Sequence, residues 1–155
     1  MKKIIETQIT LISSSGKAIV PMQLRFDDDE DAINPESEIN MIYNSIEYQG
    51  KGEDFLWVDT IADLQHKLPQ DTKIACCMTC QHGSMCPYGD AANELFCTKD
   101  LTIQNKEDLC QLFDKTDPYA ERKVSSFNYC DDFVYQSNEY YTYNDFLYQL
   151  HKKRK

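Results

Sequence analysis

Cysteine is the residue type in this sequence with the clearest chemistry, because thiolates bind metal ions and carry redox reactions. The 155 residues include seven cysteines, and five of them lie close together: Cys76, Cys77, Cys80, Cys86 and Cys97. An odd count argues against a complete disulfide framework. We expect a cytoplasmic, reducing environment, in which clustered cysteines indicate metal or redox chemistry.

Cys77 and Cys80 have the C-x-x-C spacing, which lets two thiolates reach one tetrahedral metal ion. This pair supplies only two ligands, so a zinc site needs two more from a wider group: Cys76, His82, Cys86, Cys97, Cys110 and Cys130. Within that group, Cys110 is expected to be a packed thiol inside a helix. The alternatives to zinc are an iron–sulfur cluster, a thioredoxin-type redox pair and buried thiols without a ligand.

Four short stretches give the chain a recognisable pattern: Cys-Cys-Met-Thr-Cys at 76–80, Pro-Tyr-Gly-Asp at 87–90, Phe-Cys-Thr-Lys-Asp at 96–100 and Tyr-Cys-Asp-Asp-Phe at 129–133. Over residues 73–133 the chain resembles an uncharacterised bacterial family of small proteins with no assigned activity. The resemblance implies a recurring set of four cysteines: Cys77, Cys80, Cys97 and Cys130. We therefore predict one structural Zn²⁺ ion on these four thiolates, with Cys86 as the first alternative ligand.

The elements that position the cysteines are predicted to form one α+β domain over residues 1–155. A β-rich half covers residues 1–58, and a cysteine-rich metal knuckle lies within residues 73–133. Apolar residues alternate over 5–11 and 18–26, which predicts an antiparallel hairpin, with Pro21 indicating an edge strand or a bulge. A second hairpin is predicted from a strand with Ile42, Ile46 and Tyr48, a loop over 49–53 and a strand over 55–58.

Two to three helices are expected after the hairpins. The first is capped near Asp59 and stopped by Pro69, and the second begins after Asn105. Residues 73–78 are predicted to form a short strand that leads into the cysteine cluster. A further strand is predicted over 124–135, and a last helix over about 142–152.

The charge balance narrows the class of partner. Sixteen basic and 26 acidic residues give a net charge of −10, which argues against a nucleic-acid-binding or membrane-surface protein. Asp27, Asp28 and Asp29 open a run of five acids that could attract a basic protein, and a solvated loop is the alternative. Ten tyrosines supply the second signal, with Tyr141 as the candidate contact residue and core packing as the alternative.

The sequence contains no phosphate-binding glycine loop and no Gly-x-Ser-x-Gly motif. His82 could be a loop residue, a metal ligand or a general base, whereas an all-thiolate zinc site is typically closed and structural. We therefore predict that the chain is not an enzyme. The predicted function is an acidic, zinc-stabilised binding protein that neutralises a basic protein partner, with a bacterial toxin-immunity protein as its concrete form. The alternative is a zinc-dependent adaptor or regulatory protein of unknown partner.

Overall fold

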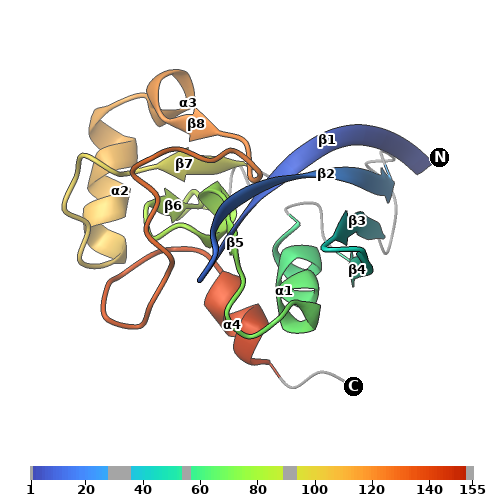
Figure 1. Cartoon of the computed structure of the whole chain (residues 1–155). Coiled ribbons are helices and arrows are strands. Elements are labelled where there is room, and N and C mark those ends of the chain that lie inside the picture. Colours follow the sequence, from blue (N-terminus) through green and yellow to red (C-terminus); the bar gives the residue numbers. More distant parts are fainter. Residues whose placement is uncertain (1, 28–35, 54–56, 89–93, 153–155) are drawn as a thin grey trace. The chain divides into compact units, whose positions relative to one another are not determined.

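The computed structural model describes residues 2–27, 36–53, 57–88 and 94–152 of the chain. The fold is mixed α+β, which confirms the predicted class (Figure 1). The chain divides into two compact units, which are described separately below. Unit 1 comprises Met1–Ile74 and Phe146–Lys155, and unit 2 comprises Ala75–Asp145.

Unit 1 is built around a curled sheet with the strand order β4-β3-β2-β1-β5. The strands are β1 (Lys2–Ser13), β2 (Gly16–Asp27), β3 (Ser37–Tyr43), β4 (Ile46–Gly52) and β5 (Lys73–Ala75), which ends one residue beyond unit 1. Helix α1 (Val58–Lys67) packs on β3 and β4, and helix α4 (Phe146–His151) packs on α1. One face of the sheet is therefore covered by a helix, and we call the opposite face the outer face.

Two N-terminal hairpins are present, the first as predicted and the second with different strands, and the alternation of apolar residues explains which face is buried. The core side chains of β1, β2 and β3 include Ile9, Leu11, Val20, Met22, Leu24, Ile39 and Met41. β1 and β2 pair antiparallel along their whole length, with Ile9 opposite Val20. Asn44 and Ser45 connect β3 to β4 with φ values of 52° and 66°, the positive pair that a tight type I′ hairpin turn needs.

The predicted bounds of the second hairpin were wrong. Ile42 lies on β3, whereas Ile46 and Tyr48 lie on β4, which continues through residues 49–52 that were predicted as a loop. Gly50 is a strand residue that pairs with Ile39, and its lack of a side chain lets α1 pack closely against the strand. A Cβ atom on Gly50 would lie 2.6 Å from the Thr60 carbonyl oxygen and 2.7 Å from the Leu64 Cβ. The predicted strand over 55–58 falls mostly outside the described residues, and Val58 begins α1.

Pro21 was predicted to mark an edge strand or a bulge, but β2 lies inside the sheet between β1 and β3. The register explains why proline is tolerated there. β3 pairs with β2 only from Met22 to Phe26, so Pro21 lies just beyond this ladder, where its missing N–H is not required for pairing with β3.

The start of α1 also differs from the prediction. Its N-cap residue is Trp57, at a positive φ of 69° and without a side-chain cap, and Asp59 lies in the first turn. The end of α1 protects the edge strand β4. The Lys51 N–H donates to the Asp63 carboxylate at 2.9 Å, and the Lys67 ammonium donates to the Gln49 carbonyl at 2.8 Å.

Unit 2 contains a small sheet with the order β6-β7-β8. Its strands are β6 (Gly83–Ser84), β7 (Leu95–Cys97) and β8 (Lys123–Val124), and its helices are α2 (Lys106–Lys115), α3 (Pro118–Glu121) and the short 3-10 helix η1 (Cys77–Thr79). The predicted cap of α2 is confirmed, since the Asn105 side chain accepts from the Asp108 N–H at 2.9 Å. Phe96 is fully buried and packs edge-on against Phe113, 5.1 Å between ring centroids.

Three other predicted elements were too long. The strand over 73–78 ends at Ala75, where the chain turns into η1. The strand over 124–135 ends at Val124, because Ser126 and Asn128 then use their carbonyls to bind η1 rather than a neighbouring strand. The last helix begins at Phe146, not near Thr142, whose hydroxyl donates to the Gln81 carbonyl at 2.6 Å.

Candidate functional site

The C-x-x-C segment forms a tight turn in unit 2. Cys77 opens η1, and the Cys80 N–H donates back to the Cys77 carbonyl at 3.3 Å. Two N–H groups point at sulfur: the His82 N–H at the Cys80 Sγ (3.5 Å) and the Asn128 side-chain amide at the Cys77 Sγ (3.6 Å). Such donors stabilise negative charge on sulfur, although burial outweighs them and raises the pKa of both thiols.

The segment over residues 126–136 holds this turn from both ends. The Cys77 N–H donates to the Asn128 carbonyl at 2.7 Å. Beyond the turn, Cys80 forms a β-bridge with Tyr135, and the Gln81 N–H donates to the Val134 carbonyl at 2.7 Å. Cys130 lies between these two attachments, so the segment carries its thiol past the Cys77–Cys80 turn.

Cys97 comes from a third segment, at the end of β7. Its N–H donates to the Arg122 carbonyl at 2.8 Å, and the Arg122 guanidinium donates to the Cys97 carbonyl at 3.1 Å. The same guanidinium binds both carboxylate oxygens of Asp100, at 2.6 and 3.0 Å. Arg122 therefore holds the backbone of Cys97 through both its N–H and its carbonyl group.

The four predicted ligands lie in one electrostatic neighbourhood. Burial raises the pKa of Cys77 to about 12, the hydrogen bond from Asn128 opposes this shift, and negative charge on other cysteines, Cys80 and Cys97 among them, adds to it. Burial also raises the pKa of Cys80, and charge on Cys97 and Cys130 contributes. These couplings join Cys77 to Cys80 and Cys97, and Cys80 to Cys97 and Cys130.

These thiols are not arranged as metal ligands in the structure. Within residues 2–27, 36–53, 57–88 and 94–152, no three or more His, Cys, Asp or Glu side chains are arranged as a group that could hold a metal ion. The fold thus brings Cys77, Cys80, Cys97 and Cys130 from three segments into one region, while the metal site itself stays a prediction.

The remaining cysteines have other surroundings. Cys76 is completely buried, and its N–H donates to the Thr79 hydroxyl at 3.1 Å. Cys86, the alternative ligand, is buried in a small apolar cluster with Phe96, against which Phe113 packs. Cys110 lies in α2 and is half-buried, in agreement with the helix predicted for it.

A pocket of about 510 Å³ lies in unit 2, next to the chain segments that carry Cys80 and Cys97. Its lining includes Gln81 and His82, which follow Cys80 in the chain, and Thr98, which follows Cys97. The His82 carbonyl accepts from the Thr98 N–H at 2.9 Å and from its hydroxyl at 3.2 Å. Two of the ligand-bearing segments therefore form one connected wall of the pocket.

The lining also includes three residues of the tyrosine-rich segment, Glu139, Tyr140 and Tyr141. Tyr140 is exposed, while Tyr141 is half-buried and its burial raises the pKa of its hydroxyl. The predicted contact residue Tyr141 and the ambiguous His82 thus line the same pocket.

The predicted acidic docking residues are only partly described. Asp27 ends β2, where its carboxylate accepts from the Glu36 N–H at 3.1 Å and pairs with the Lys2 ammonium at 3.3 Å. The Asp27 carboxylate is therefore already engaged by the backbone at Glu36 and by the Lys2 ammonium. Asp28 and Asp29 lie outside the described residues.

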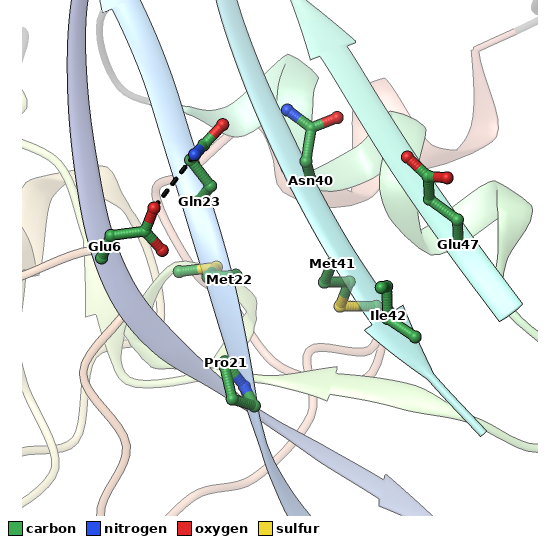
Figure 2. Close-up of a pocket in the computed structure, with 8 residues that line it drawn as sticks. All are labelled: Glu6, Pro21, Met22, Gln23, Asn40, Met41, Ile42 and Glu47. Atoms are coloured by element: carbon green, nitrogen blue, oxygen red, sulfur yellow. Dashed lines mark hydrogen bonds between the residues drawn. The ribbon is translucent and has the colours of Figure 1, made fainter. Parts of the chain in front are cut away.

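The sequence reasoning missed a second hollow, of about 440 Å³, on the outer face of the unit 1 sheet (Figure 2). The side chains on this face come from the polar positions of the alternating strands, including Glu6, Gln23, Asn40 and Glu47. Ile42 was the one hint of this hollow in the sequence, because it is an apolar residue at a strand position that alternation assigns to solvent.

No helix in the described part of the chain is long and apolar enough to cross a membrane. Comparison of the chain with protein-family models, curated proteins and solved structures gave no significant match.

Proposed function

We propose that the chain is an acidic, zinc-stabilised binding protein that neutralises a basic protein partner, as a toxin-immunity protein does. The observation that carries the proposal is the shared wall in unit 2. The residues that directly follow Cys80 and Cys97 line a pocket whose lining also includes Glu139, Tyr140 and Tyr141. A metal ion that fixes the cysteines would therefore also fix the shape of the pocket.

The metal part of the proposal rests on the donor set. Cys77, Cys80, Cys97 and Cys130 would bind Zn²⁺ as four thiolates, the ligand type and number that structural zinc sites prefer. The N–H groups of His82 and Asn128 that point at sulfur would stabilise those thiolates. Bound zinc would supply a closed, redox-inert crosslink between three chain segments.

The binding part rests on the chemistry of the pocket rim. A lysine or arginine of the partner would place its cation near the Glu139 carboxylate and against the rings of Tyr140 and Tyr141. The same segment already shows this type of contact, since the Lys106 ammonium lies 5.2 Å from the centre of the Tyr143 ring. The net charge of −10 would speed the approach of a basic protein.

The proposal gives His82 no catalytic role. Its backbone binds Cys80 and Thr98, and the residue forms part of the pocket wall. A partner that binds the pocket without being basic would instead favour the alternative, a zinc-dependent adaptor or regulatory protein.

Elemental analysis of the purified full chain tests the metal part. We expect about one zinc ion per chain, lost in Cys80→Ser and retained in the matched control Cys110→Ser, whose thiol lies on α2. Zinc far below one ion per chain in the parent protein would overturn this part.

Surface plasmon resonance with the purified products of neighbouring genes tests the binding part. We expect a basic protein to bind, and Tyr141→Ala to weaken it roughly tenfold or more, mainly through faster dissociation. Tyr148→Ala is the control, because Tyr148 is 68% exposed on α4, outside unit 2. Equal affinity of the parent and Tyr141→Ala would contradict the proposed role of the pocket.

A further inference from the structure

The outer face of the unit 1 sheet carries two adjacent rows of side chains around the hollow shown in Figure 2. The antiparallel register places Glu6, Gln23 and Asn40 in one row. Strand alternation and the pairing of β3 with β4 place Pro21 beside Ile42, which lies opposite Glu47, in the next row. The buried residues Met22 and Met41 form the floor between the two rows.

The charges in the hollow are of one sign. Its lining contains the carboxylates of Glu6 and Glu47 and no lysine or arginine. Glu6 accepts one hydrogen bond, from the Gln23 amide at 3.0 Å. Glu47 has no ion pair or side-chain hydrogen bond within the described part of the chain. A cation could therefore reach either carboxylate without breaking an existing ion pair.

The neighbouring row on this face contains basic residues as well as an acid. Arg25 and Lys51 lie there on either side of Glu38, and the Lys51 ammonium is 4.0 Å from the Glu38 carboxylate. That row therefore holds two basic residues and one acid, whereas the charged residues that line the hollow are both acids.

Part of the surface between the two carboxylates is apolar, beside the polar side chains of Gln23 and Asn40. Ile42 is 67% exposed, and the ring of Pro21 lies on the adjacent strand. Lysine and arginine carry aliphatic stems that pack on such surfaces while their charged ends reach an acid. A purely anionic ligand, such as a phosphate or a nucleic acid, would be repelled by both carboxylates.

The strand geometry fixes the spacing that an occupant must match. Glu6 lies on β1 and Glu47 on β4, three strand spacings apart, about 14 Å across the sheet, with an offset of about 7 Å along it. One side chain cannot neutralise both acids. Two cations four residues apart on an extended peptide point to the same side and are separated by a similar distance.

We propose that this hollow docks an extended basic segment of a protein partner, which lies across β1–β4 with two lysines or arginines on Glu6 and Glu47 and apolar contacts to Pro21 and Ile42. The proposal rests on the proposed function for the class of partner, a basic protein, and names a second contact surface for it. It does not depend on zinc or on the pocket of unit 2.

The test uses the full chain and a short synthetic peptide with two lysines four positions apart, separated by valine and threonine. Backbone amide NMR shifts locate the peptide, and titration gives its affinity. We expect shifts in Glu6, Gln23, Asn40 and Glu47 and a roughly 3- to 10-fold loss of affinity in the Glu6→Gln/Glu47→Gln double variant. Glu107→Gln, on α2, is the matched control and should bind as the parent does.

A peptide with two glutamates in place of the lysines should not bind. The proposal is overturned if the lysine peptide leaves the outer-face amides unshifted, or if the double variant binds as tightly as the control. Shifts confined to the pocket around Tyr141 would support the proposed function while overturning this inference. Outer-face shifts without any change near Tyr141 would support the inference and count against the pocket.

Discussion

Gly83 lies directly against the carbonyl of Cys77, so that a Cβ atom on Gly83 would overlap the Cys77 oxygen. The contact arises because the Gly83 N–H donates to the Cys80 carbonyl at 3.0 Å, which folds the chain back over the C-x-x-C turn. The backbone conformation of Gly83 does not require glycine. The absence of a side chain is needed only for this close approach.

Gly83→Ala is expected to destabilise unit 2 by about 1–3 kcal/mol, since the added methyl group must push the Cys77 carbonyl away. Thermal unfolding of the full chain, with and without a zinc chelator, measures the effect. Gly16→Ala is the comparison. Gly16 has a φ of 114° with nothing within 4 Å, so its cost of about 1 kcal/mol comes from strain in unit 1 and should not depend on the chelator. Equal stability of Gly83→Ala and the parent would show that the turn is looser than the structure indicates.

Removal of the proposed zinc ion is expected to destabilise unit 2 by several kcal/mol, because structural metal binding is coupled to folding. Cys130→Ser should reproduce this loss and make the protein insensitive to a chelator. Cys110→Ser should leave both the stability and the chelator effect nearly unchanged. Thermal unfolding monitored by circular dichroism distinguishes these cases, and identical behaviour of the two variants would count against Cys130 as a ligand.

Gln65→Leu is expected to destabilise unit 1 by about 2–4 kcal/mol. The buried Gln65 amide donates to the Thr72 carbonyl at 2.7 Å and accepts from the Ile74 N–H at 2.8 Å, so leucine would remove both of these buried hydrogen bonds. Urea unfolding gives the free energy. His66→Ala, at the neighbouring exposed position of α1, is the control and should change stability by less than about 0.5 kcal/mol. A similarly small effect of Gln65→Leu would contradict the role assigned to the amide.

The carboxylate of Asp27 should make unit 1 less stable in acid. The hydrogen bond from the Glu36 N–H, together with Lys2, holds the pKa of Asp27 below its usual value. Because the folded-state pKa is the lower one, the stabilisation is complete above the unfolded pKa of about 3.9 and is lost as the pH falls through the folded pKa.

Lys2→Gln should therefore raise the pKa of Asp27, as measured by an NMR titration of its carboxyl carbon. Lys3→Gln serves as the control, since Lys3 makes no ion pair with the described residues. An unchanged titration of Asp27 in Lys2→Gln would show that Lys2 does not contribute to the shift.

The sequence predicted the parts of the fold that follow from local patterns. Alternation predicted β1 and β2, and the side chain of Asn105 predicted the start of α2. It failed where contacts between distant residues decide the structure. Gly50 looked like a loop residue but is a strand residue against which α1 packs, and the carbonyls of Ser126 and Asn128 bind η1 instead of continuing a strand.

The same limit applies to the candidate site. The sequence identified the cysteines and Tyr141, but it could not show that the residues after Cys80 and Cys97 share a pocket with the tyrosine, because that depends on how three separate segments meet. The outer-face hollow was missed for a related reason. Glu6 and Glu47 line the same hollow only because four strands pair side by side.

Helix α4 belongs to unit 1, although the chain reaches it only after passing through the whole of unit 2. Unit 2 is thus an insertion within unit 1, and during synthesis the sheet and α1 leave the ribosome long before the helix that packs on α1. Docking of α4 closes a long loop, and a folded unit 2 shortens the effective length of that loop and lowers the entropy that its closure costs. A folded unit 2 would therefore favour the completion of unit 1.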